Sequence, residues 1–555
     1  MRKKLFAFIL GIIASTGYIG ADTFVETLTS DYLTYEFETT NHTCKIIRSK
    51  DVADGMFIDA NLVLREQILW NDIYYTVTAI GENAFSSHEK LQSIQFPSTL
   101  TTIGESAFSS CKKMKSVSFP AYCELSSVGE NAFSYCDALT SFSFPMRLGS
   151  KIISIGAYAF QHCTHLKSVQ LTYVRDIGDY AFYNCSSLSS VTIPNSVKSI
   201  GREAFGNCIS LTSVTIPESV ETIRIGGTFF GCTSLQTVVW NAKNCTIIED
   251  NNGMGIFSPF LSVPISSITF GPQVESIPNC LCVACGLKSV SISNSVISIG
   301  REAFRGCDSL TSVTIPESVI SIGNSAFASC DSLASIEVDA NNPSYCSVDG
   351  VLYNKDTTAL LQYPLGNTLT EYVIPQSVTS IGIEAFEVCD LTSITIGDGV
   401  TSIGEMAFLE CAGLISIDIP SNVISIGEAA FIRCGSLTSI TIGGGVTSIG
   451  GWAFYACSDL TAITCEATIP PACGEDVFGE VDKSIPLYVP KESINAYKNA
   501  DQWKDFTNIY AIGSSPTAIS NVQGDKTIGT KILREGQIVI RRGENTFTIQ
   551  GQEVR

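Results

Sequence analysis

One phrase recurs along most of this chain. From Ile200 to Val220 it reads Ile-Gly-Arg-Glu-Ala-Phe-x-x-Cys-x-x-Leu-x-x-Val-x-Ile-Pro-x-x-Val, and most copies follow at steps of 22 or 23 residues. The copies begin at Ile80, Ile103, Val128, Ile155, Ile177, Ile200, Ile277, Ile299, Ile322, Ile381, Ile403, Ile426 and Ile449. A fixed period of this length is the signature of stacked supersecondary units. The 555 residues therefore predict a repeat solenoid with one continuous core.

Each phrase contains a strand pattern followed by a compact turn pattern. Val214 and Ile216 alternate with hydroxyl residues, which predicts a short parallel strand with its apolar side chains in the core. Ala204, Phe205 and Cys208 are three or four residues apart, which places them on one face of a single helical turn. The Gly after Ile permits a tight entry into that turn. We therefore expect strand, turn, short helical segment and turn in every coil.

The cysteines follow the repeat. Thirteen of the 21 occupy one repeat position: Cys111, Cys136, Cys163, Cys185, Cys208, Cys232, Cys285, Cys307, Cys330, Cys389, Cys411, Cys434 and Cys457. Equivalent positions in stacked coils are about 4.7–4.9 Å apart with parallel side chains, whereas a disulfide needs Cβ atoms about 3.8 Å apart that point at each other. The pattern predicts a ladder of buried free thiols. Among the remaining cysteines, Cys465 and Cys473 are the nearest candidate for a disulfide.

The repeat resembles a known family. The pattern Leu-x-x-Val-x-Ile-Pro-x-x-Val-x-x-Ile-Gly-x-x-Ala-Phe-x-x-Cys over roughly residues 80–465 is similar to the BspA-like, treponemal-type leucine-rich repeats of surface proteins of anaerobic bacteria. This resemblance implies a curved leucine-rich repeat solenoid with short parallel strands on the concave face, short helical segments on the convex side and β caps. It also implies adhesion as the usual role. Two departures are Leu281-Cys282 in place of Ala-Phe, and His88 in place of the first ladder cysteine.

The sequence outside the plain repeats divides into further segments. Residues 1–21 read as a secretory signal peptide, with basic residues, an apolar stretch and a cleavage site after Ala21. Residues 22–79 predict an N-terminal β cap, because a solenoid must cover its open core end. Inserts are expected near 239–276 and 337–375, and Asp349-Gly350 in the second is a hairpin signal.

The C-terminal part predicts a cap, a linker and a sorting segment. Residues 466–511 read as a closing cap and residues 512–528 as a flexible linker. Residues 529–555 resemble the C-terminal β domains of proteins exported by type IX secretion. We expect a secreted or outer cell-surface protein, with the periplasm as the alternative. No later apolar run approaches the roughly 20 residues that span a bilayer, so we expect no membrane insertion.

Charge and motifs exclude several kinds of partner. A formal net charge of −20, with 34 scattered basic residues, argues against nucleic acid. Zinc at Cys282 and Cys285, or at His162 and His165, has a simpler explanation in core packing and solvated histidines. Calcium is weighed against turn chemistry at four residues that would suit either: Asp339, Asn341, Asn342 and Asp349. We predict no metal and no cofactor.

The outward strand positions are mostly serine and threonine. This face presents no acid, base and nucleophile that converge, so we expect a protein that is not an enzyme. The side chains that break the hydroxyl pattern are the candidate ligand contacts: Gln95, Gln170, Glu337, Asp339, Asp418 and Glu466. The leading hypothesis is an adhesin-like protein that recognises a host matrix protein, a glycan or another bacterial surface. The alternative is a structural envelope protein without a dedicated ligand; the sequence does not predict an oligomeric state.

Overall fold

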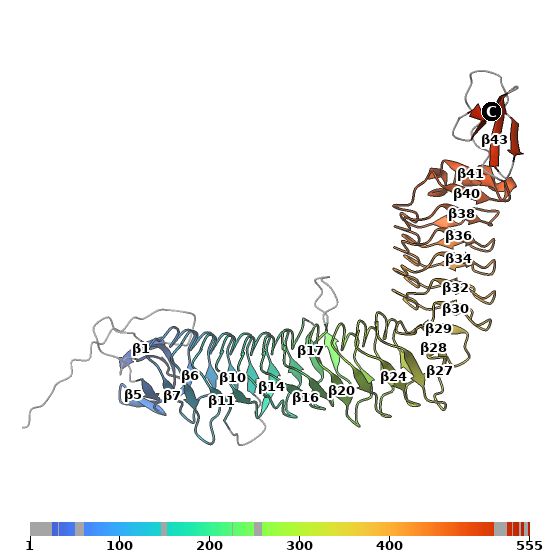
Figure 1. Ribbon diagram of the computed structural model, residues 1–555. Helices are drawn as coiled ribbons and strands as arrows, with labels where there is room; N and C mark the ends of the chain where they lie inside the picture. The colour runs from blue at the N-terminus through green and yellow to red at the C-terminus, as the bar shows by residue number, and fades with distance from the viewer. Residues whose placement is uncertain are drawn as a thin grey trace, which may run out of the picture.

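The chain forms a parallel β-solenoid of about 18 turns (Figure 1). The computed structural model describes residues 25–30, 33–49, 60–145, 153–224, 226–248 and 258–514, and four strands after residue 529. The predicted signal peptide and most of the predicted linker lie outside the described residues. Among the described residues, no helix is long and apolar enough to cross a membrane.

One coil shows how the sequence folds. Strand β15 (Ser199–Ile200) leads into a turn segment, β16 (Ser213–Ile216) follows, and β17 (Thr222–Arg224) starts the next coil. The ladder is in register, with Ile200 beside Ile223 in the neighbouring coil. The alternating burial of β16 is the predicted one, with Val214 and Ile216 in the core. Most coils therefore add one strand to each of two ladders.

The first ladder, here called the Ser-Ile ladder, contains the short strands at the heads of the repeats, most of which precede a glycine. Besides β15 and β17 it comprises β8 (Thr102–Ile103), β10 (Ser127–Val128), β12 (Ile153–Ile155), β14 (Val174–Ile177), β19 (Thr246–Ile248), β21 (Ser276–Ile277), β23 (Ser298–Ile299), β25 (Ser321–Ile322), β29 (Ala359–Gln362), β31 (Ser380–Ile381), β33 (Ser402–Ile403), β35 (Ser425–Ile426), β37 (Ser448–Ile449) and β39 (Ala472–Cys473).

The second ladder, here called the hydroxyl face, contains the longer strands with outward Ser and Thr. Besides β16 it comprises β4 (Asn61–Val63), β7 (Ser93–Gln95), β9 (Ser116–Ser118), β11 (Ser141–Ser143), β13 (Ser168–Gln170), β18 (Thr237–Trp240), β20 (Ser267–Phe270), β22 (Ser289–Ser291), β24 (Ser312–Ile315), β26 (Ser335–Val338), β30 (Glu371–Val373), β32 (Ser393–Thr395), β34 (Ser416–Ile419), β36 (Ser439–Ile442), β38 (Ala462–Cys465), β40 (Pro486–Val489) and β41 (Asn508–Ala511).

The prediction of a helical segment in each coil is wrong. The turn segment is a string of turns in which Glu203 and Asn207 have left-handed backbone angles, with φ of 45° and 55°. Its amide groups alternate between two kinds of acceptor. Phe205 N donates to Thr228 O (3.0 Å) and Asn207 N to Phe230 O (2.7 Å) in the adjacent coil, whereas Gly206 N donates to Glu203 O (2.9 Å) within its own coil. A regular right-handed helix cannot include the left-handed residues, and half of the amides are bonded to the neighbouring coil.

The phenyl rings of the Ala-Phe pairs stack on one another from coil to coil inside the solenoid, in runs that are interrupted between Phe260 and Phe304 and between Phe327 and Tyr363. Phe160 and Phe182, for example, are 5.1 Å apart with an interplanar angle of 4°. The buried side chains form two clusters, one from Leu33 to Leu352 and one from Val351 to Phe506. These clusters are the cores of the two arms that meet at a bend in Figure 1.

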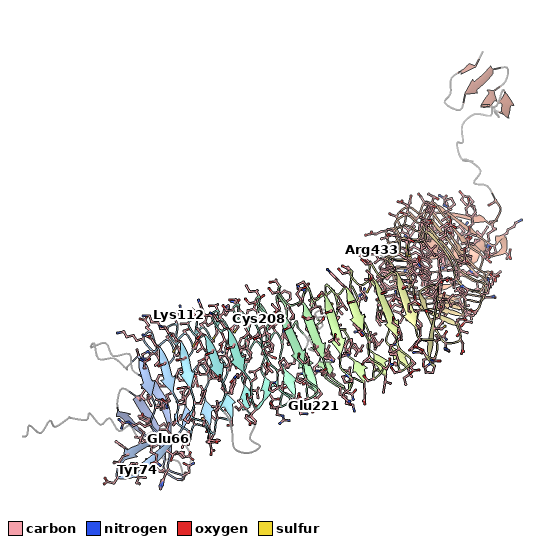
Figure 2. All side chains as sticks on the ribbon, turned by 60° about the horizontal axis from the view of Figure 1, so that its bottom comes forward. Glu66, Tyr74, Lys112, Cys208, Glu221 and Arg433 are labelled. Carbon is pink, nitrogen blue, oxygen red and sulfur yellow. The ribbon has the colours of Figure 1, made fainter. Side chains whose placement is uncertain are left out.

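The N-terminal end is a small sheet that continues into the Ser-Ile ladder. It contains β1 (Val25–Ser30), β2 (Leu33–Glu38), β3 (Thr43–Ser49), β5 (Gln67–Trp70) and β6 (Ile73–Ile80). Strand β3 is parallel to β6, which pairs with β8. Glu66, at this end of the array in Figure 2, accepts hydrogen bonds from the amide and hydroxyl groups of Ser98, both at 2.9 Å.

The regular coils extend beyond their expected limits. Within 239–276, β18 and β20 pair in register and β19 joins the Ser-Ile ladder, and residues 249–257 lie outside the described residues. Past residue 465, Phe478 still stacks on Phe454 at 5.7 Å. The final coil also holds the short helices η1 (Lys491–Ser493), α1 (Ile494–Tyr497) and η2 (Trp503–Asp505).

The last strands form a separate antiparallel sheet at the C-terminal end of Figure 1. They are β42 (Thr530–Arg534), β43 (Gln537–Arg542), β44 (Asn545–Thr548) and β45 (Glu553–Val554).

The bend lies in the second expected insert. Strands β27 (Tyr345–Val348) and β28 (Val351–Asn354) form the hairpin that Asp349-Gly350 predicts. Strand β25 is the last strand of its sheet, and its residue Ile322 donates its backbone N–H to the Tyr345 hydroxyl of the hairpin (2.8 Å). New contacts therefore replace the regular ladder where the direction of the solenoid changes.

None of the 21 cysteines is in a disulfide, and 19 of them are buried. The pairing of Cys465 with Cys473 considered above is absent, because Cys465 Sγ instead accepts a hydrogen bond from the Tyr497 hydroxyl at 3.1 Å. The ladder thiols have a role beyond filling space. Cys208 Sγ, for example, donates to Phe182 O of the preceding coil at 3.3 Å.

Candidate functional site

The six residues proposed from sequence all lie on the hydroxyl face or at its strand ends, with exposed side chains. Gln95, Gln170, Glu337 and Asp418 are outward positions of β7, β13, β26 and β34. Asp339 and Glu466 follow β26 and β38 directly.

The structure does not bring these six residues into one site. Gln95 and Gln170 lie in early coils, Glu337 and Asp339 lie just before the bend, and Asp418 and Glu466 lie in the second arm. Most of their register neighbours are small hydroxyl residues, such as Thr314 beside Glu337 and Thr441 beside Asp418. The arrangement provides isolated polar contacts along an extended surface rather than one reaction centre.

Some hydroxyl groups near the strand starts have a structural role. Thr438 Oγ1 donates to Ile415 O, and Thr461 Oγ1 to Thr438 O, each at 3.0 Å. Thr401 Oγ1 makes the equivalent bond to Thr379 O. These side chains therefore tie successive coils together, which explains their repetition without a ligand.

The residues weighed as metal ligands have protein partners. His162 Nδ1 is 2.7 Å from Asn184 Nδ2, and Cys163 Sγ donates to Phe133 O at 3.2 Å. Asn342 is fully buried and hydrogen-bonded to four backbone groups. Within the described part of the chain, no group of three or more His, Cys, Asp or Glu side chains could hold a metal ion.

A group of aromatic side chains on the turn segments is the most distinctive surface feature of the first arm. This aromatic strip comprises Tyr135, Tyr158, His162, Tyr180 and Tyr183. Tyr158 and Tyr180 stack with 5.0 Å between ring centroids and 1° between planes, and Tyr135 stacks on His162 at 4.6 Å and 10°. Tyr183 packs edge-on to Tyr180 at 5.6 Å. Tyr135 is 43% exposed and the other four side chains are half-buried, so the strip lies at the surface.

Polar groups surround the aromatic strip. The Tyr180 hydroxyl donates to Glu203 Oε1 (3.2 Å), and Asn207 Nδ2 donates to the Tyr183 hydroxyl (2.8 Å). Burial raises the pKa of Tyr180, and the Glu203 carboxylate raises it further. Burial also raises the pKa of Glu203. Rigid aromatic rings with hydrogen-bonding edges are characteristic of contact surfaces that recognise large ligands.

A helical turn segment does not predict the aromatic strip. Tyr158 and Tyr180 stand three residues after the Ile that heads their repeats, and Tyr135 and His162 stand seven residues after. Both positions have left-handed backbone angles that turn their side chains away from the core. A column-by-column alignment of the repeats would reveal aromatic residues clustered there in consecutive copies.

The repeats identify the family. The chain matches the BspA type leucine rich repeat region, described with six copies, at residues 66–172, 127–252, 153–281, 253–347 and 365–480. The matched segments cover well over half of the chain, so the protein belongs to this family. No curated protein matches the chain.

Several solved structures are similar to this one. A leucine-rich repeat protein from Bacteroides ovatus is 26% identical, with 78% of this chain and 93% of that chain covered and a TM-score of 0.46. A leucine rich cell surface protein from Faecalibacterium prausnitzii is 25% identical, with coverages of 88% and 95% and a TM-score of 0.34. The pneumococcal vaccine antigen PcpA is 16% identical, with coverages of 88% and 99% and a TM-score of 0.32.

Proposed function

We propose that this chain is an exported, adhesin-like binding protein of the cell surface or the secreted fraction. It would engage a host matrix protein, a glycan or another bacterial surface, without catalytic turnover. The observation that carries the proposal is the aromatic strip, in which five rings from consecutive coils gather on one exposed face. Family membership and the signal-peptide pattern support the same function.

The proposed contact surface has two parts. The aromatic strip would supply the few strong contacts that dominate the affinity of most interfaces. The hydroxyl face, with Glu337, Asp339 and Asp418 as its charged exceptions, would supply weaker polar contacts. The C-terminal sheet after residue 529 would act as the type IX sorting segment that delivers the protein to the surface.

A binding array tests this function. The mature chain is applied to immobilised matrix proteins, mucin glycans and bacterial cells. Tyr135→Ser combined with Tyr158→Ser should weaken attachment at least about tenfold, because an interface hot spot contributes about 2 kcal/mol. The matched control is Tyr122→Ser, which removes a 59% exposed ring outside the strip. A triple Ala variant at Glu337, Asp339 and Asp418 tests the hydroxyl face separately.

Two outcomes contradict the proposal. Attachment of the wild-type protein at background level on every surface would remove the binding function. Unchanged attachment of both variant sets would place the contact elsewhere on the molecule.

A structural role in the cell envelope is the second candidate. It is favoured by apolar side chains exposed at the N-terminal tip, where Leu69 is 52%, Ile73 39% and Tyr74 62% exposed (Figure 2 labels Tyr74). Self-association through this tip would give concentration-dependent oligomers in analytical ultracentrifugation that Tyr74→Ser abolishes. Oligomers of this kind, together with background attachment to every surface of the binding array, would favour the envelope role.

A further inference from the structure

Two ladder cysteines differ from the other eleven in sequence. Eleven are followed by two residues and then Leu or Met, whereas Cys285 and Cys389 are followed by a single residue and Leu. The coil is thus one residue shorter directly after each of these two cysteines. A deletion at this point changes the direction in which the thiol can project.

The same two cysteines differ in their sulfur contacts. The other eleven thiols donate to a backbone carbonyl of the preceding coil at 3.0–3.3 Å. Cys389 Sγ instead lies 3.0 Å from Cys411 Sγ of the following coil, and Cys285 Sγ lies 3.7 Å from Cys307 Sγ. The shortened coils have therefore turned these sulfur atoms along the solenoid axis, toward a second sulfur.

We propose that Cys389 and Cys411 are an oxidisable pair that forms a disulfide between adjacent coils at the base of the second arm. Parallel cysteines in regular coils are poorly placed for a bridge, but the shortened repeat removes that obstacle for Cys389. The 3.0 Å separation must close by about 1 Å to reach a bond of about 2.05 Å. Cys285 and Cys307 start from a longer separation and are not included.

The reaction needs a small-molecule disulfide as oxidant, here glutathione disulfide. The Cys389 thiolate attacks one of its sulfur atoms and expels one glutathione thiolate. The Cys411 thiolate then attacks Cys389 Sγ in the mixed disulfide and expels the second glutathione. The two protein thiols lose two protons and two electrons, and glutathione disulfide becomes two glutathione thiols.

The pair must react before the core closes. Cys389 and Cys411 are 1% and 0% exposed. Burial raises the pKa of Cys411 well above its ordinary value, which makes its thiolate scarce in the folded protein. Oxidation therefore belongs to folding in an oxidising compartment, and in this respect the inference rests on the proposed export.

The experiment counts thiols in the full chain after production in an oxidising compartment. The protein is denatured without reductant and its free thiols are titrated. Wild-type protein has 21 cysteines, so one bridge leaves 19. Cys389→Ala removes one cysteine and releases Cys411, which gives 20. The matched control Cys434→Ala removes a carbonyl-bonded ladder cysteine and keeps the bridge, which gives 18.

This difference of two thiols between variants does not depend on any other bridge in the chain. Cys411→Ala must give the same count as Cys389→Ala, and circular dichroism checks that each variant is folded. Because the compartment is imposed, the result is independent of whether the protein binds a host ligand or is exported naturally.

Peptide mapping identifies the bond directly. Trypsin cannot separate the two cysteines, because no Lys or Arg lies between them, but cleavage after Glu405 and Glu410 places them on different peptides. We expect a linked pair that contains Cys389 and Cys411 and disappears on reduction. Twenty-one free thiols in the wild-type protein, equal counts in Cys389→Ala and Cys434→Ala, or a link from Cys411 to Cys434 would each overturn the proposal.

Discussion

At the scale of single residues, the most constrained polar side chain is Asn342. It is fully buried beside the bend, where Nδ2 donates to Pro316 O (2.7 Å) and Val319 O (2.9 Å). Its Oδ1 accepts from the amides of Ser344 (2.9 Å) and Tyr345 (2.8 Å). One side chain thus joins the last coil of the first arm to the hairpin that begins the bend.

Asn342→Ala should be strongly destabilising. It leaves the two buried acceptors Pro316 O and Val319 O and two partly buried amide donors without this partner. Each buried group costs about 1–3 kcal/mol, so we expect a loss of at least about 3 kcal/mol. Chemical denaturation measures the effect. Asn341→Ala is the control, because Asn341 is exposed and should change stability by less than about 0.5 kcal/mol. Equal effects of the two substitutions would contradict this role for Asn342.

At the scale of the repeating element, the glycine column is explained by space rather than by backbone freedom. The glycines after Ile do not have left-handed backbone angles, unlike residues two positions later. A Cβ on Gly427 would lie 2.5 Å from both Glu405 N and Gly404 C of the preceding coil. Glycine is therefore needed at this position, as expected. The reason is the close approach of the preceding coil and not a tight entry into the turn.

Gly427→Ala should therefore force two neighbouring backbones apart. Overpacking of this kind costs about 1–3 kcal/mol. Gly435→Ala lies in the same coil and is the matched control, because its Cβ would meet nothing within 4 Å. Thermal unfolding should show a lower midpoint for Gly427→Ala and little change for Gly435→Ala. Similar midpoints would refute the close-approach explanation.

At the scale of the whole molecule, an ion cluster joins the two arms across the bend. The Arg305 guanidinium contacts Glu384 and Glu387, each at 2.5 Å, and Ser329 Oγ donates to Glu387 Oε2 at 2.8 Å. Glu384 and Glu387 are 79 and 82 residues from Arg305 in the sequence. Burial raises the pKa of Glu387 to about 7. The Arg305 guanidinium lowers this pKa, and the Glu384 carboxylate raises it.

The raised pKa makes the stability of the molecule depend on pH. The folded state holds a proton on Glu387 that the unfolded state has lost, so this contribution is complete below about pH 4.5 and disappears as the pH rises to about 7. The loss is at most about 3 kcal/mol, and less where solvent screens the cluster. Glu387→Gln should flatten the stability profile over this window, as measured by denaturation at several pH values. Parallel profiles for the two proteins would contradict the raised pKa.

Much of the architecture follows from the sequence because each coil contacts mainly its neighbours. The spacing of Val214 and Ile216 predicted β16 and its buried face, and the recurring cysteines predicted a column of free thiols. Asp349-Gly350 predicted the hairpin at the bend. The first two features follow from the pattern of the repeat, and the hairpin follows from a two-residue turn signal, so all three depend on local sequence.

Only the tertiary structure decided the rest, because the interactions involved join residues far apart in the chain. The turn segment avoids a helix since its amide donors find acceptors in the next coil, as with Phe205 and Thr228. That choice places the aromatic strip at the surface, which the periodicity of the repeat does not predict. The bend needs partners as distant as Arg305 and Glu387, and no spacing within a single phrase specifies such a contact.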